Sequence, residues 1–277
     1  MKPPLSCNTR DLPDALQMLF DSHNHLQSPR FGGNADELIR EMKAVGIQGC
    51  VVNATRENDW ADVARLAERF EGFVFPAFGI HPWFAHTAKP GWQERLRRQL
   101  ERYQNATLGE AGVDGWVDSP SMDLQIEVFR DQWDLAAELK LPLTVHCLKA
   151  WEELFHIIDS SQKAPDKILM HSFGGSLEIA QRLLKYDTWF SFSGYFLQPR
   201  KRKVLEVYKQ LPADRILLET DAPDMAPPED LISKPTTGAV NHPANLRSIA
   251  EAFEREFPGG ILEQIHKNTV EFWGFWK

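Results

Sequence analysis

The residues best suited to chemistry near the start of the chain are two histidines separated by one residue. His23 and His25 follow the apolar residues Leu19 and Phe20, which predicts that they stand at the end of a strand. Successive side chains of a strand point to opposite faces, so Asp21, His23 and His25 would share one face. Two imidazoles one pleat apart can bind a single metal ion. Taken alone, the pair is also compatible with a hydrogen-bonded surface turn.

Further histidines and acidic residues stand where later apolar runs end. These residues are His81, Glu110, His146, His171 and Asp221. With His23 and His25, five of the nine histidines therefore stand at predicted strand ends. We expect exposed, capping or packed side chains at the other four, His86, His156, His242 and His266.

Histidines and carboxylates that converge on one cavity would form a site for divalent metal ions. Glu110 is the natural bridge between two ions because one carboxylate has two oxygens to share. A pair of ions can clamp the attacking and leaving oxygens of a displacement and activate water near neutral pH. Asp221 follows an apolar run, where its carboxylate could bind metal and accept the proton of the attacking water.

The elements that must position these residues alternate along the chain. Strand-like apolar runs cover residues 18–25, 49–54, 73–80, 106–113, 142–147, 167–173, 189–193 and 216–220. Helix-like periodic stretches cover residues 34–45, 57–70, 92–103, 122–139, 151–158, 177–186, 203–211, 243–257 and 261–273. Buried strands joined by helices indicate a parallel sheet, and eight such units predict a (β/α)8 TIM barrel. A doubly wound open sheet is the alternative, but no Gly-x-Gly-x-x-Gly follows the first strand.

Length and composition are those of a globular protein with a sizeable core. The chain has 277 residues, of which 43% are hydrophobic and 25% charged, and we expect one domain over residues 1–277. Three scattered cysteines suit a reducing compartment, and no apolar run approaches membrane-spanning length. We therefore expect a cytoplasmic protein with no membrane association and no obligate protein partner.

The formal net charge of −8 argues against tight, non-specific binding of duplex nucleic acid. The only dense basic run is Arg-Lys-Arg-Lys at residues 200–203. Such a run is either a solvated helix face or a patch that steers phosphates. A site whose own cations receive the phosphate remains compatible with the overall charge.

Six short motifs, taken in order, resemble the TatD family of metal-dependent hydrolases in the amidohydrolase superfamily. They are Asp21-Ser22-His23-Asn24-His25, Gly79-Ile80-His81-Pro82, Gly109-Glu110-Ala111-Gly112-Val113-Asp114, Val145-His146, His171-Ser172-Phe173-Gly174-Gly175 and Glu219-Thr220-Asp221-Ala222-Pro223. The resemblance runs from about residue 18 to the end of the chain. It implies a TIM barrel with one to three divalent ions and phosphodiesterase activity on DNA, often as a 3′-to-5′ exonuclease.

The same resemblance implies roles for individual residues. The metal set would be His23, His25, Glu110, His146, His171 and Asp221, with Glu110 and Asp221 also catalytic. His81 would face the scissile phosphate. Such histidine-rich sites accept Mg²⁺, Mn²⁺ or Zn²⁺ according to availability.

Two positions depart from the family pattern. Gly115 stands where the family often carries an aromatic residue, and Trp116 follows it. Leu148 stands where the family often carries an arginine, and this removes a bidentate phosphate donor. Lys149 could substitute for that arginine from a different direction. Trp116 and Trp83, just past strand ends, could stack on bases, pack, or form a lid.

The sequence therefore predicts a metal-dependent hydrolase that cleaves phosphodiester bonds, most readily in single-stranded DNA. A metal-activated water would attack the phosphorus, and Asp221 would accept its proton. One alternative is hydrolysis of a carboxylic ester, lactone or amide, as elsewhere in the superfamily. A second alternative is a barrel that keeps its metals without catalysis. Cys147 points away from His146 on the same strand, so we expect a core residue there rather than a nucleophile.

Overall fold

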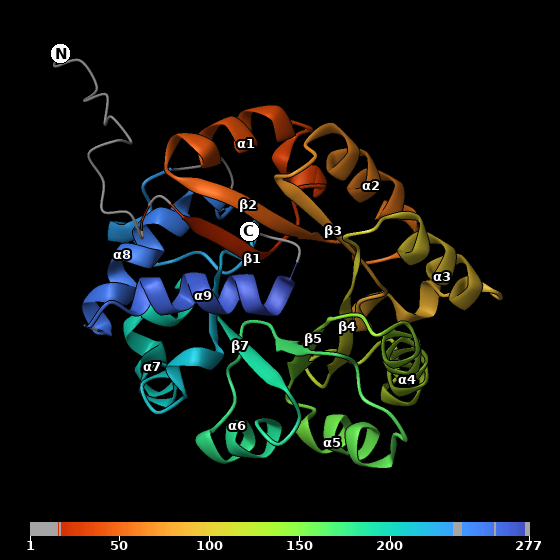
Figure 1. The fold of residues 1–277 in the computed structure, drawn as a ribbon. Coiled ribbons are helices and arrows are strands. Elements are labelled where there is room, and N and C mark those ends of the chain that lie inside the picture. The colour runs from red at the N-terminus through yellow and green to blue at the C-terminus, as the bar shows by residue number, and fades with distance from the viewer. Residues whose placement is uncertain (1–15, 17, 235–239, 258, 275–277) are drawn as a thin grey trace, which may run out of the picture.

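A computed structural model describes residues 16, 18–234, 240–257 and 259–274 of the chain. Its centre is one parallel sheet whose eight strands follow each other in chain order (Figure 1). The strands are β1 (Leu19–Asn24), β2 (Ile47–Asn53), β3 (Val74–Phe78), β4 (Thr107–Asp114), β5 (Leu143–Leu148), β6 (Ile168–Met170), β7 (Thr188–Ser193) and β8 (Ile216–Glu219). This order confirms the predicted (β/α)8 TIM barrel.

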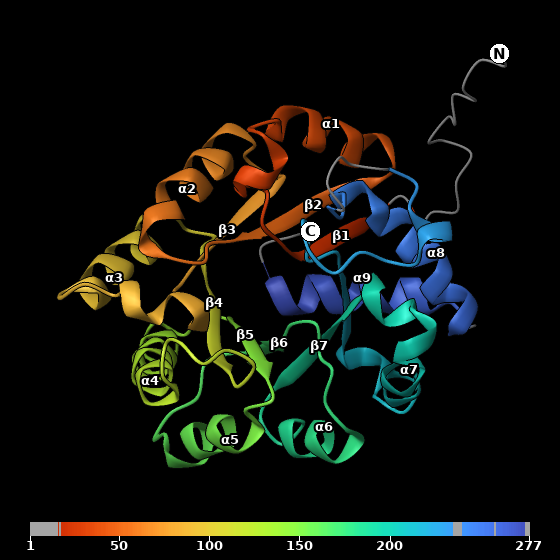
Figure 2. The same ribbon diagram turned by 180° about the vertical axis from the view of Figure 1, so that it is seen from behind.

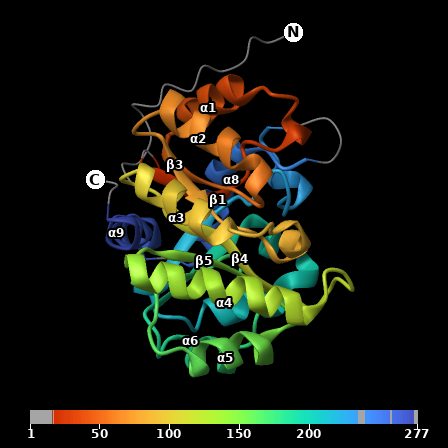
Figure 3. The ribbon, with the colours of Figure 1, turned by 90° about the vertical axis from the view of Figure 1, so that its right-hand side faces the viewer.

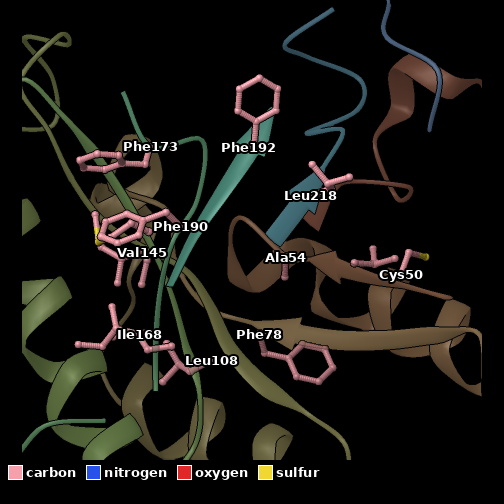
Figure 4. Packing of buried hydrophobic residues seen from close by; sticks show 14 of the residues in the cluster. Cys50, Ala54, Phe78, Leu108, Val145, Ile168, Phe173, Phe190, Phe192 and Leu218 are labelled. Atoms are coloured by element: carbon pink, nitrogen blue, oxygen red, sulfur yellow. The ribbon is translucent and has the colours of Figure 1, made fainter. Parts of the chain in front are cut away.

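Helices follow the strands and surround the sheet (Figure 1). They are α1 (Ala35–Ala44), α2 (Trp60–Arg69), α3 (Trp92–Arg102), α4 (Met122–Leu139), α5 (Trp151–Ser160), α6 (Leu177–Leu183), α7 (Arg202–Tyr208), α8 (Leu246–Glu256) and α9 (Ile261–Trp273). Each helix turns its apolar stripe toward the sheet, as the periodic stretches predicted. Figure 4 shows the resulting core, in which residues such as Phe78, Leu108 and Ile168 pack together.

Hydrogen bonds join the first and last strands at their carboxyl ends. The amide of His25 donates to the carbonyl of Ala222 at 2.8 Å, and the amide of Asp221 donates to the carbonyl of His23 at 2.9 Å. The Asp21 carboxylate accepts from the Thr220 amide at 2.9 Å and from its hydroxyl at 2.6 Å. These bonds close the ring around the barrel axis.

The amino end of the barrel is filled by large apolar side chains. Phe20, Trp189 and Leu217 form one buried cluster with Phe272 and Trp273 of α9. Figure 1 shows α9 crossing in front of this end, and the side view of Figure 3 places it at one extreme of the molecule. Figure 2 views the molecule from behind, toward the opposite end, where the carboxyl ends of the strands open.

The structure differs from the sequence prediction mainly at strand ends. The sixth strand is shorter than expected because the chain turns after Met170, with Ser172 in the left-handed region at φ 42°. In β1 the pairing register shifts between Asp21 and Asn24. The Asp21 carboxylate, which was not part of the predicted metal set, binds Thr220 rather than the histidine cluster.

Candidate metal centre

Seven side chains meet at the carboxyl ends of the strands. They are His23, His25, His81, Glu110, His146, His171 and Asp221. His23 lies in β1 and His25 directly after it, Glu110 lies in β4, and His146 lies in β5. Their metal-ligating atoms fall into three groups whose members lie within 4.8 Å of one another. The structure thus brings together every residue that the sequence singled out at a strand end.

Glu110 stands at the centre of the cluster, and its two oxygens face different histidines. Oε2 lies 3.4 Å from Nε2 of His23 and 3.3 Å from Nε2 of His25. Oε1 lies 3.0 Å from Nδ1 of His146 and 2.8 Å from Nε2 of His171. Only 2% of Glu110 is exposed. One carboxylate between two sets of imidazoles is the arrangement that a bridging ligand requires.

Asp221 closes the side of the cluster that faces β1. Its Oδ1 lies 3.5 Å from Nε2 of His23 and 3.5 Å from Nε2 of His25. The two imidazole nitrogens themselves lie 3.3 Å apart. His23, His25 and Asp221 therefore form a second ligand group that shares His23 with the group of Glu110 and His171.

Three glycines allow the strands to approach closely at Glu110. A Cβ at Gly112 would lie 1.8 Å from the carbonyl oxygen of His146, and one at Gly79 would lie 2.9 Å from the backbone of Gly109. Gly109 and Gly112 also have φ values of 153° and 152°, which L side chains rarely adopt. The Gly-Glu-Ala-Gly motif is thus the local reason why Glu110 reaches the centre of the barrel.

The electrostatics of the cluster are those of carboxylates surrounded by imidazoles. Burial alone would raise the pKa of Glu110, but His171 and other neighbouring histidines hold it well below its usual value. Burial would lower the pKa of His25 and of His171. At His25, hydrogen bonds to Asp221 and Glu110 outweigh the effect of burial, and at His171 the interaction with Glu110 outweighs it. The pKa values of both histidines therefore lie well above the ordinary histidine value. The carboxylates are therefore ionised and hold protons on these two imidazoles, which a bound metal ion would displace.

Two other histidines are kept neutral. Burial lowers the pKa of His81 to about 4 and, with His171 nearby, lowers the pKa of His23. A neutral imidazole is the form that binds metal. The Nε2 atom of His81 lies 3.2 Å from Oε1 of Glu110, and its Nδ1 accepts from the amide of Trp83 at 3.1 Å. The structure thus places His81 inside the donor cluster, although the family resemblance assigned it to the phosphate.

Outer hydrogen bonds orient the rings of His25 and His146, and a carboxylate lies near that of His171. Nδ1 of His25 lies 2.7 Å from the carbonyl oxygen of Asn53, and Nε2 of His146 lies 3.0 Å from Oδ2 of Asp114. Nδ1 of His171 lies 3.7 Å from Oε1 of the buried Glu219. Partners of this kind fix ring orientation and tautomer in metal sites.

Asp114 and Glu219 were not singled out from the sequence as functional residues. Both are fully buried carboxylates in the same strands as residues that were, β4 and the last strand, β8. Glu219 accepts 2.7 and 2.5 Å hydrogen bonds from the amide and hydroxyl of Ser172. An acidic residue within a buried strand was the signal that could have identified each of them.

Two of the three residues predicted to bind substrate, Trp116 and Lys149, lie at the rim of the cluster, whereas His81 lies within it. Trp116 is 66% exposed, and the Lys149 ammonium lies 4.3 Å from the centre of its ring. Leu148 is also exposed there. A Cβ at Gly115 would lie 2.5 Å from the carbonyl oxygen of Lys149, so the close pairing of β4 with β5 excludes an aromatic residue at that position.

His242 and Cys147, which the sequence analysis did not assign to the metal site, lie outside the described metal groups. His242 bonds Glu41 through Nε2 at 2.9 Å, and its Nδ1 accepts from the amide of Ala244 at 3.0 Å, which makes it a capping residue. Cys147 is partly buried against the core, and burial raises the pKa of its thiol. A neutral thiol is a poor nucleophile. This agrees with the prediction that Cys147 is a core residue rather than a nucleophile.

The cluster suits divalent cations in its donor chemistry. Its atoms are imidazole nitrogens and carboxylate oxygens, which serve zinc, manganese and related ions. The convergence of so many donor atoms in a buried space, with anionic charge at the centre, has no counterpart in an ordinary hydrogen-bonded core. A TIM barrel with this centre at its mouth defines the class of metal-dependent hydrolases.

Comparison with known proteins agrees with this class. The family described as TatD related DNase matches residues 20–274. An uncharacterized metal-dependent hydrolase of Bacillus subtilis, YabD, is 30% identical over 92% of this chain and 96% of its own length. The 3′-5′ ssDNA/RNA exonuclease TatD of a Pantoea species is 29% identical over 84% of this chain and 89% of its own length.

Solved structures show the same fold. The TatD homologue YjjV of Escherichia coli superimposes with a TM-score of 0.84 at 26% identity, covering 93% of this chain and 98% of YjjV. An organophosphorus hydrolase from Deinococcus radiodurans shares the fold with a TM-score of 0.62 at 16% identity, over 94% of each chain. The chain belongs to the TatD family. It is a metal-dependent hydrolase, and none of its described helices is long and apolar enough to cross a membrane.

Proposed function

We propose that the protein hydrolyses phosphodiester bonds at the end of single-stranded DNA, as a 3′-to-5′ exonuclease. The observation that carries this proposal is the position of Glu110 between two sets of imidazoles, which suits a pair of divalent ions. The Pantoea relative is named a 3′-5′ ssDNA/RNA exonuclease, which supports the same substrate class. The metal centre supports hydrolysis by an activated water molecule, and the name of this relative supports a phosphodiester substrate.

The ligand set that we propose has six members. They are His23, His25, Glu110, His146, His171 and Asp221. Divalent ions bound there would act as Lewis acids toward the phosphate and lower the pKa of a water molecule. His81 lies close enough to Glu110 to join the set or to meet a phosphate oxygen with its neutral ring.

Asp221 is the proposed proton acceptor. Burial would raise the pKa of its carboxyl group, but His25 and its neighbours hold it below the usual value, so the group is ionised at neutral pH. Only 8% of Asp221 is exposed, and it lies at the open end of the barrel. An ionised carboxylate in this position can take a proton from the attacking water and later release it to solvent.

Trp116 and Lys149 are the proposed contacts for the nucleotide next to the scissile bond. The indole is exposed at the rim, and the ammonium beside it forms no ion pair with any described carboxylate. An aromatic face can stack on a base of any identity, and an adjacent cation can meet the phosphate. This pair would take over the phosphate contact of the arginine that the family often carries at the position of Leu148.

Hydrolysis of a carboxylic ester, lactone or amide is the second candidate. The exposed Leu148 favours it, because an apolar rim suits an uncharged substrate better than a phosphate. The third possibility from the sequence, a barrel without catalysis, is set aside by membership of a hydrolase family.

The test is hydrolysis of a single-stranded oligonucleotide labelled at either end. Metal-stripped protein would receive Mg²⁺, Mn²⁺ or Zn²⁺, with Glu110→Ala and Asp221→Asn as inactive controls. Stepwise shortening from the 3′ end that both substitutions abolish is the expected result. No cleavage by folded, metal-loaded protein, together with turnover of an ester or lactone, would select the second candidate.

A cytoplasmic location is part of the proposal. Both described cysteines, Cys50 and Cys147, are free thiols, which is compatible with a reducing compartment. Fractionation of cells that express the full chain would test it, and recovery outside the cytoplasm would contradict it.

A further inference from the structure

Cations without a carboxylate partner gather on aromatic rings around the mouth of the barrel. The Arg56 guanidinium lies 4.3 Å from the ring centre of Phe84, after β2 and β3. After β7, the Arg200 guanidinium and the Lys201 ammonium lie 5.2 and 4.9 Å from the ring centre of Tyr195. None of these three cations forms an ion pair with a carboxylate among the described residues. In a chain with a net charge of −8, such cations at the mouth are unusual.

Several arginines on the outer helices are instead paired with carboxylates. The guanidinium groups of Arg95 and Arg98 lie 2.6 and 3.1 Å from the carboxylates of Glu57 and Glu94, and that of Arg202 lies 3.0 Å from Glu206. The basic run at residues 200–203 is therefore divided. Arg202 belongs to a paired helix face, whereas Arg200 and Lys201 precede the helix and stand at Tyr195.

The segment that carries Tyr195 is held firmly at the height of the metal centre. Ser193, the last residue of β7, is in register with Glu219, whose Oε1 lies 3.7 Å from Nδ1 of His171. Tyr195 follows two residues later in the 3-10 turn η6 (Gly194–Leu197). Phe196 of the same turn is buried in the core. The Tyr195 ring is thus fixed in place by its neighbour before any ligand arrives.

A side-chain hydrogen bond orients Arg200, and backbone contacts hold the segment that carries Lys201. The Tyr195 hydroxyl accepts a 3.0 Å hydrogen bond from the Arg200 guanidinium, and the Lys201 amide donates to the carbonyl of Gln198 at 2.7 Å. The side-chain amide of Gln198 donates to the carbonyl of Ala226 in the loop after β8 at 3.5 Å. A preorganised aromatic ring with two unpaired cations is the combination that binds a base and its phosphates without sequence preference.

This cluster lies on a different part of the rim from the Trp116 and Lys149 pair. The strands form a ring in chain order, and Trp116 and Lys149 follow β4 and β5, whereas Tyr195 follows β7. A strand of nucleic acid that contacts both groups must extend along the mouth of the barrel from β4 to β7. A second contact several nucleotides from the cleaved bond would lengthen the bound segment and raise affinity.

We infer that Tyr195, Arg200 and Lys201 form a second nucleotide-binding subsite that binds single-stranded nucleic acid on the part of the rim that follows β7, apart from Trp116 and Lys149. This inference rests on the proposed function. The subsite acts on binding of long strands and takes no part in the chemical step.

The experiment compares binding of two labelled substrates to full-length, metal-loaded protein carrying Asp221→Asn to slow cleavage. One is an oligothymidylate of about 15 nucleotides, within the length range of extended single-strand sites. The other is a dinucleotide, too short to contact both parts of the rim. We expect Tyr195→Ala and the double variant Arg200→Ala/Lys201→Ala each to weaken binding of the long strand about fivefold or more. Dinucleotide binding should stay within about twofold, since each change removes a contact that only the long strand makes.

Salt dependence supplies a second readout. Each phosphate contact on a single strand contributes about 0.7 to the slope of log affinity against log salt concentration. The slope for the double variant should therefore be shallower by roughly 1.4. Tyr195→Phe keeps the ring and removes only the hydrogen bond to Arg200, so it should lose less affinity than Tyr195→Ala. Arg255→Ala is the matched charge control, because Arg255 is exposed near the end of α8 and forms no described ion pair.

Each outcome separates this inference from the proposed function. Unchanged long-strand affinity in both variants, no long-strand binding by the parent, or equal loss for the dinucleotide would overturn the subsite. Selective loss of long-strand binding supports it even where the otherwise unsubstituted enzyme fails to cleave DNA, and that failure would count against the proposed function alone. Circular dichroism and thermal unfolding of each variant confirm that its fold is retained.

Discussion

At the scale of single residues, the site depends on carboxylates whose two oxygens contact different partners. Glu110 separates two sets of imidazoles because its two oxygens point in different directions. Asp114 connects the metal centre to the rim. Its Oδ2 faces His146 at 3.0 Å and accepts from the Trp83 indole at 2.7 Å, while Oδ1 accepts from the Trp116 amide at 2.7 Å. A change at Asp114 would therefore disturb both the ligand and the aromatic rim.

The Asp114→Asn variant should bind metal more weakly without unfolding. An amide cannot hold the His146 ring as a carboxylate does, and loss of such an outer partner commonly lowers metal affinity about 10- to 100-fold. Competition against a chelator would measure the affinity. Asp118→Asn, in the exposed loop after β4, is the control and should bind as the parent does. Equal affinity in the two variants would show that Asp114 does not position His146.

At the scale of elements, close strand packing at the glycines of β4 sets the position of Glu110. We expect Gly112→Ala to lower the free energy of unfolding by about 3 kcal/mol or more, because the new Cβ overlaps the carbonyl of His146 in a backbone conformation that alanine avoids. Urea denaturation would measure it. Gly174→Ala is the control, since its nearest contacts would be 4.0 Å away. A loss below about 1 kcal/mol at Gly112 would contradict the packing argument.

The attachment of α7 should depend on pH through Tyr208. This phenol is buried and donates to the carbonyl of Ser191 at 2.6 Å. Burial, with Glu219 nearby, raises its pKa well above the usual value. A raised pKa means that the stabilising contribution is complete below about pH 10, the ordinary tyrosine pKa, and is lost as pH rises further.

Tyr208→Phe removes this dependence. The variant should be less stable than the parent by about 1 kcal/mol at pH 8, because a hydrogen bond is lost, and the gap should narrow or reverse above pH 10. Urea unfolding of the parent and the variant across this pH range would measure the difference. A gap between parent and Tyr208→Phe that stays constant with pH would show that the phenol ionises equally in both states.

The order and type of elements could be predicted from sequence because they depend on local periodicity. The helices over residues 122–139 and 261–273 match α4 and α9 at both ends. The prediction failed where a distant partner decides the local structure. The sixth strand ends early because the turn after it is held by Glu219 of β8. No local pattern marks such contacts.

At the scale of the whole molecule, the metal centre is the point where all parts of the barrel meet. Its seven side chains follow or end strands from one end of the sequence to the other, from His23 to Asp221. The strand-end rule predicted which residues converge, because parallel strands place their carboxyl ends together. It could not predict the orienting contacts at Asp114 and Glu219, nor the cations on the rim, since these depend on side-chain packing between loops.

Metal binding should therefore stabilise the entire fold. An ion that binds only the folded chain adds RT ln(1 + [L]/Kd), about 4 kcal/mol at a thousandfold excess over Kd. For a chain of this size that corresponds to a rise in Tm of roughly 10 °C. Thermal unfolding with excess chelator and with added Mn²⁺ or Zn²⁺ would measure the difference. Glu110→Ala should lose most of the metal-dependent shift, because the two ligand groups no longer share an anion, whereas Asp118→Asn should keep it. An identical Tm with and without metal would show that ions contribute nothing to holding the strand ends together.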